Sequence, residues 1–378
     1  MASGLYLTLL VGPVVALPAP KPLMDALTAV EVTTSATGRS GFQLSFTLAD
    51  RSPLQTLFLL AAGGPTVELR VIIVATVNGI PQVLMDGVMR HHEVQPAGDA
   101  GHSTLFIKGE DLTAVMDLVP LPGLPYPMPA EARVAAMLAK YAMYGIVPMI
   151  VPSVVPDTPI PVERIPGQQG TDLAYINQLA GKVGYVFYLD PGPVPGISTA
   201  YWGPQIKFGI PQPALSVNMD SWTNVEQLSF RYEPQKFRLP IVTIVEPTTH
   251  TPIPIPIPPV TPLNPPLGLV PATTPSGFDT LDDTAKLDPG QALMIGMARA
   301  SANADIVSGN GTLDVLRYGQ VLKARQLVGV RGAGPAFDGL HYVDSVTHRI
   351  SRGEYKQSFT LTRNALVSNT PIVPTIGI

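Results

Sequence analysis

The sequence predicts a mainly β protein with α+β insertions, and three observations carry this prediction. Phe42–Leu48 and Tyr355–Thr362 alternate apolar and polar side chains, as strands with one buried face do. Ala130–Tyr144 instead places apolar side chains at helical spacing. Residues 247–275 hold 11 prolines in 29 residues and no Asp, Glu, Lys or Arg, so a regular helix is excluded there.

Residues 1–125 form the first predicted β region. Val67–Val77 is rich in Val and Ile, and the Asn78-Gly79 that follows it is a strong signal for a two-residue hairpin turn. Ile80–Met85 is then the predicted return strand. Leu105–Ile107 follows another Gly-rich turn and predicts a further strand.

Residues 126–204 differ in character and predict a small α+β middle domain. After the helix named above, the Pro-rich stretch Val147–Pro166 cannot be regular helix. Thr171 or Asp172 is suited to cap a second, short helix. The apolar run Tyr185–Leu189 then predicts a buried strand.

The β pattern returns at 205–245 and again at 310–378, on either side of an insertion at 246–309. Within the insertion, Thr251–Pro259 favours polyproline II, so we expect an extended strap that lies along a surface. Asp288-Pro289 has the chemistry of an N-cap followed by the first residue of a helix, and it predicts a helix at the end of the insertion.

Two segments far apart in the chain share one order of signals. Met85–Val88 and Phe337–Leu340 each contain Asp-Gly, which predicts a turn, and each is followed by a strand pattern. A turn near Gly101 or at Gly353 and an alternating strand come next. Either the likeness is chance, because Asp-Gly is a common hairpin signal, or the chain holds two related β modules.

The composition excludes several classes of function. The net charge of −4, with no basic block among 24 Lys and Arg, argues against specific nucleic-acid binding. The absence of Cys excludes disulfide scaffolds, thiol nucleophiles and Cys-zinc sites. Only 14% of the residues are charged, against about 25% in an average soluble domain. Surfaces poor in charge are typical of large permanent interfaces, so the composition favours a component of an obligate assembly.

The apolar segment Gly4–Ala19 is the best candidate for a membrane span or signal peptide. Pro13 and Pro18 interrupt it, and no basic residue precedes Lys21. We therefore expect neither stable membrane insertion nor a signal peptide.

The residues able to perform acid–base or metal chemistry are few and scattered. His91 and Glu93 can share one strand face, but a zinc site needs further ligands, so a polar strand edge is the preferred interpretation. His341 and His348 are an odd number of residues apart on one predicted strand, which places them on opposite faces. Asp282-Asp283 lacks the spacing of a calcium loop.

Sequence motifs for catalysis or nucleotide binding are also missing. There is no G-x-S-x-G elbow, and Gly181-Lys182 lacks the rest of a P-loop. Gly332–Gly334 predicts a turn, and Asn310–Thr312 is a weak glycosylation signal. We therefore predict no catalytic, cofactor-binding or metal-ligating residues, no cofactor and no enzymatic activity.

A series of short motifs in one order gives a resemblance to a known family. The densest part is at the C-terminal end, and it comprises Gln291–Ala300, Gly309–Leu313, Leu316–Val321, Gly329-Val330, Phe337–Gly339, Tyr342-Val343, Ser345–His348 and Tyr355–Asn364. Thr171–Leu189, Asp86–Val88 and Gly109–Leu112 extend the match. Together they resemble the late control D family of phage tails, the gp27-like baseplate hub also found at the N-terminal end of VgrG spikes.

The resemblance implies a trimer with two tube-like β-barrel modules per chain, the second split between 205–245 and 310–366. Three chains then offer six similar barrels, a pseudo-hexameric ring that joins the six-fold inner tube to the three-fold spike. Residues 1–378 leave no room for an oligosaccharide-binding barrel, lysozyme or needle, so a separate spike protein is implied. The Pro-rich stretch 247–275 matches no motif of the family.

The sequence thus predicts a structural baseplate hub of a contractile phage tail or an extracellular contractile injection system. Its expected partners are two further copies of itself, the inner tube ring, the spike, and other baseplate or wedge proteins. Its expected location is the baseplate of a virion or injection particle that is assembled in the bacterial cytoplasm. The alternatives are the hub of a long non-contractile tail and, in another class, a secreted or envelope-associated hydrolase with a Pro-rich linker.

Overall fold

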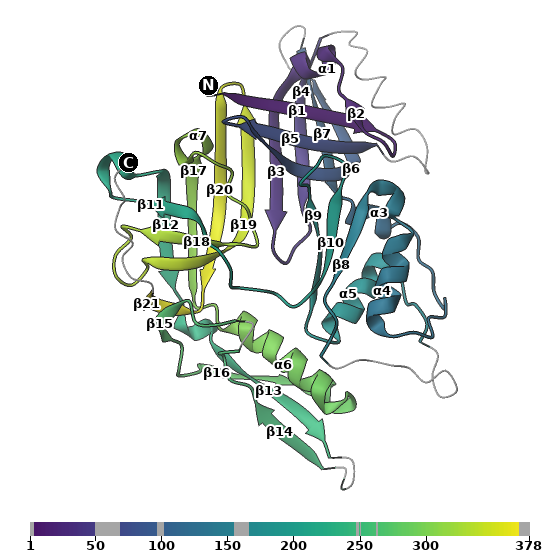
Figure 1. The fold of residues 1–378 in the computed structure, drawn as a ribbon, viewed down its shortest axis with the longest axis vertical. Coiled ribbons are helices and arrows are strands. Elements are labelled where there is room, and N and C mark those ends of the chain that lie inside the picture. Colours follow the sequence, from purple (N-terminus) through teal and green to yellow (C-terminus); the bar gives the residue numbers. More distant parts are fainter. Residues whose placement is uncertain are drawn as a thin grey trace.

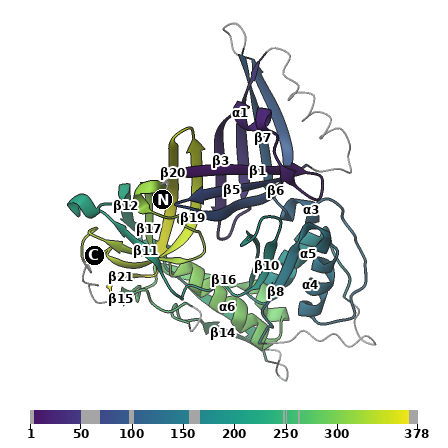
Figure 2. The same cartoon turned by 45° about the horizontal axis from the view of Figure 1, so that its top comes forward.

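The chain folds into two β modules side by side, and two smaller units project from the same end of both (Figures 1 and 2). The structure is a computed structural model, and it describes residues 4–49, 69–96, 102–154, 166–246, 249, 251–261 and 264–369. The mainly β architecture predicted from the sequence is confirmed.

The first module is an antiparallel sheet in the order β3-β4-β7-β6-β5-β1-β2. Its elements are β1 (Leu5–Gly12), β2 (Leu17–Pro18), α1 (Lys21–Ala26), β3 (Leu27–Ser35), β4 (Gly41–Ala49), β5 (Arg70–Val77), β6 (Ile80–Pro96) and β7 (His102–Asp111). The apolar N-terminal segment pairs along the whole of β5, and Leu9 is buried in the core. Leu5, Leu7 and Val11 are partly buried against the same core, whereas Tyr6, Val15 and Leu17 are exposed, so pairing with β5 covers this segment only in part.

The hairpin turn at Asn78-Gly79 is confirmed, since both residues have positive φ, as a type I′ turn requires. The turn predicted at Asp86-Gly87 is wrong, because both residues lie inside β6. A Cβ on Gly87 would stand 2.2 Å from the carbonyl oxygen of Glu110 in β7. Glycine is thus needed here for close strand contact and not for chain reversal. The turn expected near Gly101 lies outside the described residues.

The second module combines strands from both sides of the insertion. Its elements are β11 (Gln212–Ser216), η2 (Asp220–Trp222), β12 (Val225–Tyr232), β17 (Val307–Asp314), α7 (Val315–Tyr318), β18 (Leu327–Arg331), β19 (Gly339–Ser351) and β20 (Glu354–Arg363). The strand order is β12-β17-β20-β19, and β18 and β11 follow beside β19. The predicted alternation in Tyr355–Thr362 is confirmed, because Tyr355, Phe359 and Leu361 are buried.

β19 also pairs antiparallel with β3, so one sheet runs through both modules. The hydrophobic core is shared in the same way. Phe46 in β4 and Phe359 in β20 belong to one continuous cluster of buried side chains. The two modules are therefore held together by backbone hydrogen bonds and by common apolar burial.

The prediction that His341 and His348 face opposite sides of β19 is wrong. Both side chains are buried, and both lie on the core face. A β-bulge between Val343 and Ser345 adds one residue to the strand and reverses the alternation of its faces. Burial lowers the pKa of each histidine to about 3, so both stay neutral at ordinary pH.

The middle unit packs helices against a three-stranded sheet in the order β8-β10-β9. Its elements are α3 (Thr113–Met116), α4 (Ala130–Ala139), η1 (Ala142–Tyr144), β8 (Ile146–Ile150), α5 (Asp172–Gly181), β9 (Val186–Pro191) and β10 (Ser198–Gly203). The cap of the second helix is Thr171, whose Oγ1 accepts a 3.2 Å hydrogen bond from the Ala174 backbone N–H. Trp202 is fully buried in the separate core of this unit.

The insertion unit is a hairpin with a third strand and one long helix. Its elements are η3 (Pro234–Lys236), β13 (Arg238–Val245), β14 (Pro252–Pro256), β16 (Gly277–Leu281), η4 (Asp282–Lys286) and α6 (Pro289–Asn303). β15 (Gly268–Pro271) leaves this unit and pairs with β21 (Ala365–Ser368). The predicted start of α6 is confirmed, because the Asp288 carboxylate accepts a hydrogen bond from the Gly290 N–H at 2.8 Å.

The expected polyproline strap is wrong, since Pro252–Pro256 is a β-strand paired with β13. The prolines occupy every second position, and the Ile257 N–H donates to the Pro240 carbonyl at 2.9 Å. By the same register the N–H groups of Ile253 and Ile255 face β13, whereas the prolines stand at the outer edge, where no donor is needed. The expected apposition to a surface is confirmed, because Ile257 is buried under α6.

Candidate assembly surfaces and junctions

The solvent face of the shared sheet is polar and uncharged where β12, β17, β20 and β19 meet. A groove of about 520 Å³ lies over this face, and none of the residues that line it carries a charge. Most have hydroxyl or amide side chains, namely Gln227, Ser229, Asn310, Thr312, Ser345, Thr347, Ser358 and Thr360. The weak glycosylation signal at Asn310 falls inside this face. Such a surface stays wet and holds no group activated for chemistry.

The polar face continues across the junction into the first module. The hydroxyl groups of Thr33 in β3 and Thr347 in β19 lie 3.0 Å apart and share a hydrogen bond. Two residues further along the same face of β19, Arg349 forms an exposed ion pair with Glu31 at 3.3 Å. The junction between the modules therefore adds side-chain contacts to the backbone pairing.

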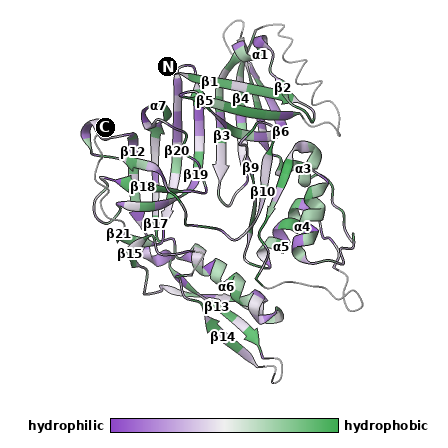
Figure 3. Ribbon diagram, viewed as in Figure 1, coloured by the Kyte–Doolittle hydropathy of each residue, from purple (hydrophilic) through white to green (hydrophobic). Residues whose placement is uncertain are grey.

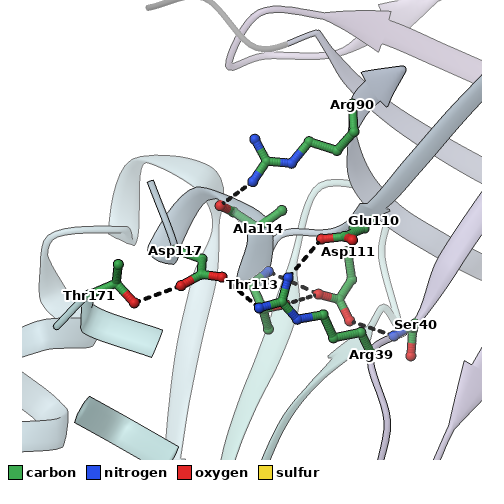
Figure 4. A network of polar contacts seen from close by, with 9 residues as sticks. All are labelled: Arg39, Ser40, Arg90, Glu110, Asp111, Thr113, Ala114, Asp117 and Thr171. Atoms are coloured by element: carbon green, nitrogen blue, oxygen red, sulfur yellow. Dashed lines mark hydrogen bonds and ion pairs between the residues drawn. The ribbon is translucent and has the colours of Figure 1, made fainter. Parts of the chain in front are cut away.

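A polar network fastens the first module to the middle unit (Figure 4). Arg39, in the β3–β4 loop, donates to Glu110 at 3.2 Å and to Asp117 at 2.5 Å. Asp117 also accepts from the hydroxyl of Thr171, the residue that caps α5, at 2.7 Å. One arginine thus links two strands of the module to the start of a helix in the middle unit.

Two carboxylates of this network have opposite electrostatic behaviour. The Thr171 hydrogen bond, followed by the contacts of Arg39, lowers the pKa of Asp117. Burial raises the pKa of Asp111, although Thr113 and the Ser40 N–H donate to it. Desolvation therefore dominates at Asp111 and hydrogen bonding dominates at Asp117.

A buried ion pair forms a second attachment between the first module and the middle unit. The Arg70 guanidinium meets Asp86 with two hydrogen bonds of 2.8 and 2.7 Å, and both side chains are almost fully buried. The same guanidinium donates to the Tyr144 carbonyl at 2.7 Å, and Ser198 donates to Asp86 at 3.3 Å. A bidentate pair with these further partners fixes the orientation of the middle unit relative to the first module, because the geometry of the pair tolerates little displacement.

The linker from the middle unit to β11 is anchored by Lys207. Its ammonium group is buried, pairs with Asp305 and lies 5.7 Å from the centre of the Tyr342 ring. The neighbouring Ile206, Phe208 and Ile210 are exposed, and Ile210 keeps 94% of its surface. The linker therefore binds its own chain through a charge and presents apolar side chains to its surroundings.

The residues selected from the sequence do not assemble into a site. His91 and Glu93 are exposed on β6, where Glu93 lies 3.6 Å from Lys108. Within the described ranges there is no group of three or more potential metal ligands. Gly332 and Ala333 form a bend, and the turn that was predicted there lies just after it, where the Phe337 N–H donates to the Gly334 carbonyl at 3.0 Å. No described helix is long and apolar enough to span a membrane.

The sequence reasoning missed the residues that join the parts. Arg70 and Lys207 were both overlooked, yet each stands in an apolar stretch of a chain with few charges. Arg70 directly precedes four Val and Ile residues of a buried strand. A charged residue in such an apolar run needs a partner if it is buried. Its position therefore indicates, from the sequence alone, a residue that could join two parts of the fold.

The strand order, the middle unit and the split second module together define a fold that this chain shares with solved tail proteins. No family model matches the sequence, and no curated protein matches it either. Comparison with solved structures therefore supplies the particular relatives.

Two tail proteins match over nearly their whole length. A tail protein from Neisseria meningitidis MC58 has 14% identity and a TM-score of 0.61, over 96% of this chain and 97% of that one. The 43 kDa tail protein of prophage MuSo2 from Shewanella oneidensis has the same identity and TM-score, over 96% and 100%. The E. coli c3393 protein, described as a type VI secretion component similar to T4 tail proteins gp27 and gp5, has 10% identity and a TM-score of 0.52, over 91% and 76%. At these identities the likeness is one of fold.

Proposed function

We propose that this protein is the structural, non-enzymatic hub of a tail baseplate. Three copies form a pseudo-hexameric ring that joins a hexameric inner tube to a separate trimeric spike, and other baseplate or wedge proteins surround it. The particle is a contractile phage tail or an extracellular contractile injection system, assembled in the bacterial cytoplasm. The named functions of the structural relatives support this proposal.

The order and direction of the strands support the proposed ring. The strands β12-β17-β20-β19 and β3-β4-β7-β6 follow each other edge to edge, and every neighbouring pair is antiparallel. Both four-strand sets therefore have the same sequence of strand directions. The hairpins β19–β20 and β6–β7, which share the Asp-Gly pattern, occupy corresponding places in the two sets. A rotation about one axis can thus relate the sets, as a pseudo-hexamer built from three chains requires.

The ring would close through the two ends of this sheet. Among the residues that the structure describes, β12 pairs with β17 alone, and residues 91–96 of β6 pair with β7 alone. Each has an unpaired edge, and antiparallel pairing of β6 with β12 of the next copy would continue the pattern of directions. Closure removes both edges, which is the general solution to exposed strand edges.

In this ring the uncharged polar face lines the channel. The centre of this lining is rich in hydroxyl and amide groups, and the charges beside it, such as Arg349 with Glu31 and Lys356 with Glu226, are paired, so DNA or protein cargo can pass without strong binding. We further propose the domain division 1–125 for the first barrel, 126–204 for the middle domain, 205–245 with 310–378 for the second barrel, and 246–309 for the insertion.

The test is the solution mass of the full-length protein together with two edge variants. Val94→Glu in β6 and Tyr232→Glu in β12 place a carboxylate at the edges that close the ring, on side chains already exposed in one chain. Leu316→Glu, on the equally exposed surface of α7, is the matched control. We expect trimers for the unmodified protein and the control, and monomers for both edge variants. A monomeric unmodified protein, also in the presence of its tube and spike, would refute the hub.

A further inference from the structure

The insertion unit has an apolar face that is covered at one end, where Leu239 packs against Phe237 and Val307, and is otherwise exposed or half-buried in the described chain. Residues opposite one another in the paired strands β14, β13 and β16 share a face, and α6 covers only one side of this sheet. The other side, here called the insertion face, consists of Ile241, Thr243, Val245, Pro252, Pro254, Pro256, Phe278 and Thr280. It holds no charged residue, and Phe278 keeps 59% of its surface. In Figure 3 green segments alternate with paler ones along β13 and β14.

The middle unit has a second uncovered apolar surface, the loop between α3 and α4. Leu118, Val119, Leu121 and Leu124 are all exposed, with 61% for Val119, and no charge occurs from Leu118 to Leu124. We call residues 118–124 the leucine loop. Its backbone is nevertheless fixed, because the Leu121 N–H donates to Gly170 at 3.0 Å and the Gly123 N–H to Gln168 at 2.9 Å. A rigid loop that exposes large apolar side chains is typical of a preformed contact surface.

These two surfaces lie on different sides of the molecule. α6 contacts the middle unit of its own chain, where a Cβ on Gly184 would stand 2.6 Å from the Met294 carbonyl oxygen. The insertion face is on the side of its sheet opposite to α6. The leucine loop runs along the outer border of the middle unit, away from the insertion (Figures 1 and 2).

The proposed ring brings the two surfaces together. The insertion belongs to the module that begins with β12, and the middle unit belongs to the module that ends with β6. Where β6 of one copy meets β12 of the next, the middle unit of the first copy adjoins the insertion of the second. A cyclic ring needs two different complementary surfaces on each chain, and this chain presents two that are rigid, apolar and uncharged.

We propose that the insertion face of one copy packs against the leucine loop of the next copy. This inference rests on the proposed ring and adds a second contact below the paired strands. Because neither surface carries a charge, the contact buries apolar area without desolvating an ion. The prolines at the outer edge of β14 leave it without N–H donors, so the unit can dock by its face and not by its edge.

The absence of Cys from the chain makes a covalent test direct. Val119→Cys on the leucine loop and Phe278→Cys on the insertion face are introduced singly and together in the full-length protein. Each variant is treated with a short bis-maleimide and separated under denaturing conditions. We expect the double variant to give covalent dimers and trimers, and each single variant to remain monomeric. The unfolding midpoint in urea confirms that the variants fold.

The outcomes separate this inference from the ring itself. If the solution mass is that of a trimer and the double variant yields no cross-linked species, the contact is wrong and the ring stands. If a single variant cross-links to a dimer, the contact is two-fold and the inference is again wrong. If no trimer forms, both proposals fail. As a further measure, Phe278→Asp should weaken trimer formation about tenfold or more, whereas Phe278→Leu should leave it unchanged.

Discussion

The two β modules each bury an arginine beside an Asp-Gly pair, but they satisfy its charge differently. Arg70 in the first module meets the Asp86 carboxylate with two hydrogen bonds. Arg363 in the second donates instead to two backbone carbonyls, those of Asp338 at 2.9 Å and Leu267 at 3.1 Å. Burial lowers the pKa of Arg363 to about 10, although the charge of the nearby Asp338 carboxylate acts in the opposite direction. In the first module the Asp-Gly pair thus belongs to an ion pair that holds the middle unit. In the second module it lies beside an arginine that anchors loops.

The largest expected effect tests what the modules have in common. Phe46→Asp and Phe359→Asp each place an unpaired charge in the shared core, so each variant should fail to fold and to enter particles. Thr47→Asp and Thr360→Asp put the same charge on the neighbouring exposed positions and should remain soluble. Yield of soluble protein and assembly of particles are the measurements. Normal particles from either Phe variant would show that the core is not shared as described.

The next prediction addresses the difference between the two arginines. Arg70→Met leaves the Asp86 carboxylate buried without a cation and should cost about 3–5 kcal/mol of unfolding free energy. Arg363→Met leaves only two carbonyls without a donor and should cost about 1–3 kcal/mol. Urea unfolding at neutral pH measures both.

A second substitution sharpens this contrast. In the Arg70→Met background, Asp86→Asn removes the stranded charge and should recover part of the lost stability. Equal losses for the two arginine variants, or no recovery, would mean that the ion pair has no special role in the first module.

The smallest effect compares two carboxylates of one network by their pH dependence. The folded-state pKa of Asp111 is raised, so the native state holds this proton more tightly than the unfolded state does. The ionised side chain therefore lowers the free energy of unfolding as pH rises above the ordinary pKa of about 3.9. Asp111→Asn should therefore be neutral or stabilising at pH 7, and the difference should vanish below that value.

Asp117 should show the opposite sign. Its pKa is lowered, so its contribution is present above the ordinary value and is lost as pH falls through the lowered one. Asp117→Asn should therefore destabilise at pH 7, within about 1 kcal/mol because the side chain is partly exposed, and match the unmodified protein in acid. Urea midpoints measured from acid to neutral pH check both variants, and profiles of the same sign would contradict the assignment.

The elements found from the sequence are those whose signal is local. The alternation in Phe42–Leu48, the cap at Thr171 and the start at Asp288 each depend on a few adjacent residues, and all three are confirmed. The errors arose where distant strands decide the outcome. Polyproline II and a strand edge have similar backbone angles, and only the pairing of Pro252–Pro256 with β13 separates them.

The candidate surfaces were harder to predict from the sequence than the fold. The bulge in β19 changes which residues face the core, and its cause lies in the register with β20. The polar face is contributed by strands from both sides of the insertion, so no single segment reveals it. The buried charges had a visible signal, as Arg70 does beside its apolar strand, but their partners are set by tertiary contact.

The proline-bordered strand β14 has one more consequence for a protein that closes on itself. A chain that assembles through two free strand edges benefits when its other edges cannot pair, because pairing through them would join copies in the wrong order. With prolines at each outward position of β14, an incoming strand would find acceptors but no donors. The insertion can therefore lie close to many neighbours during assembly without pairing through β14.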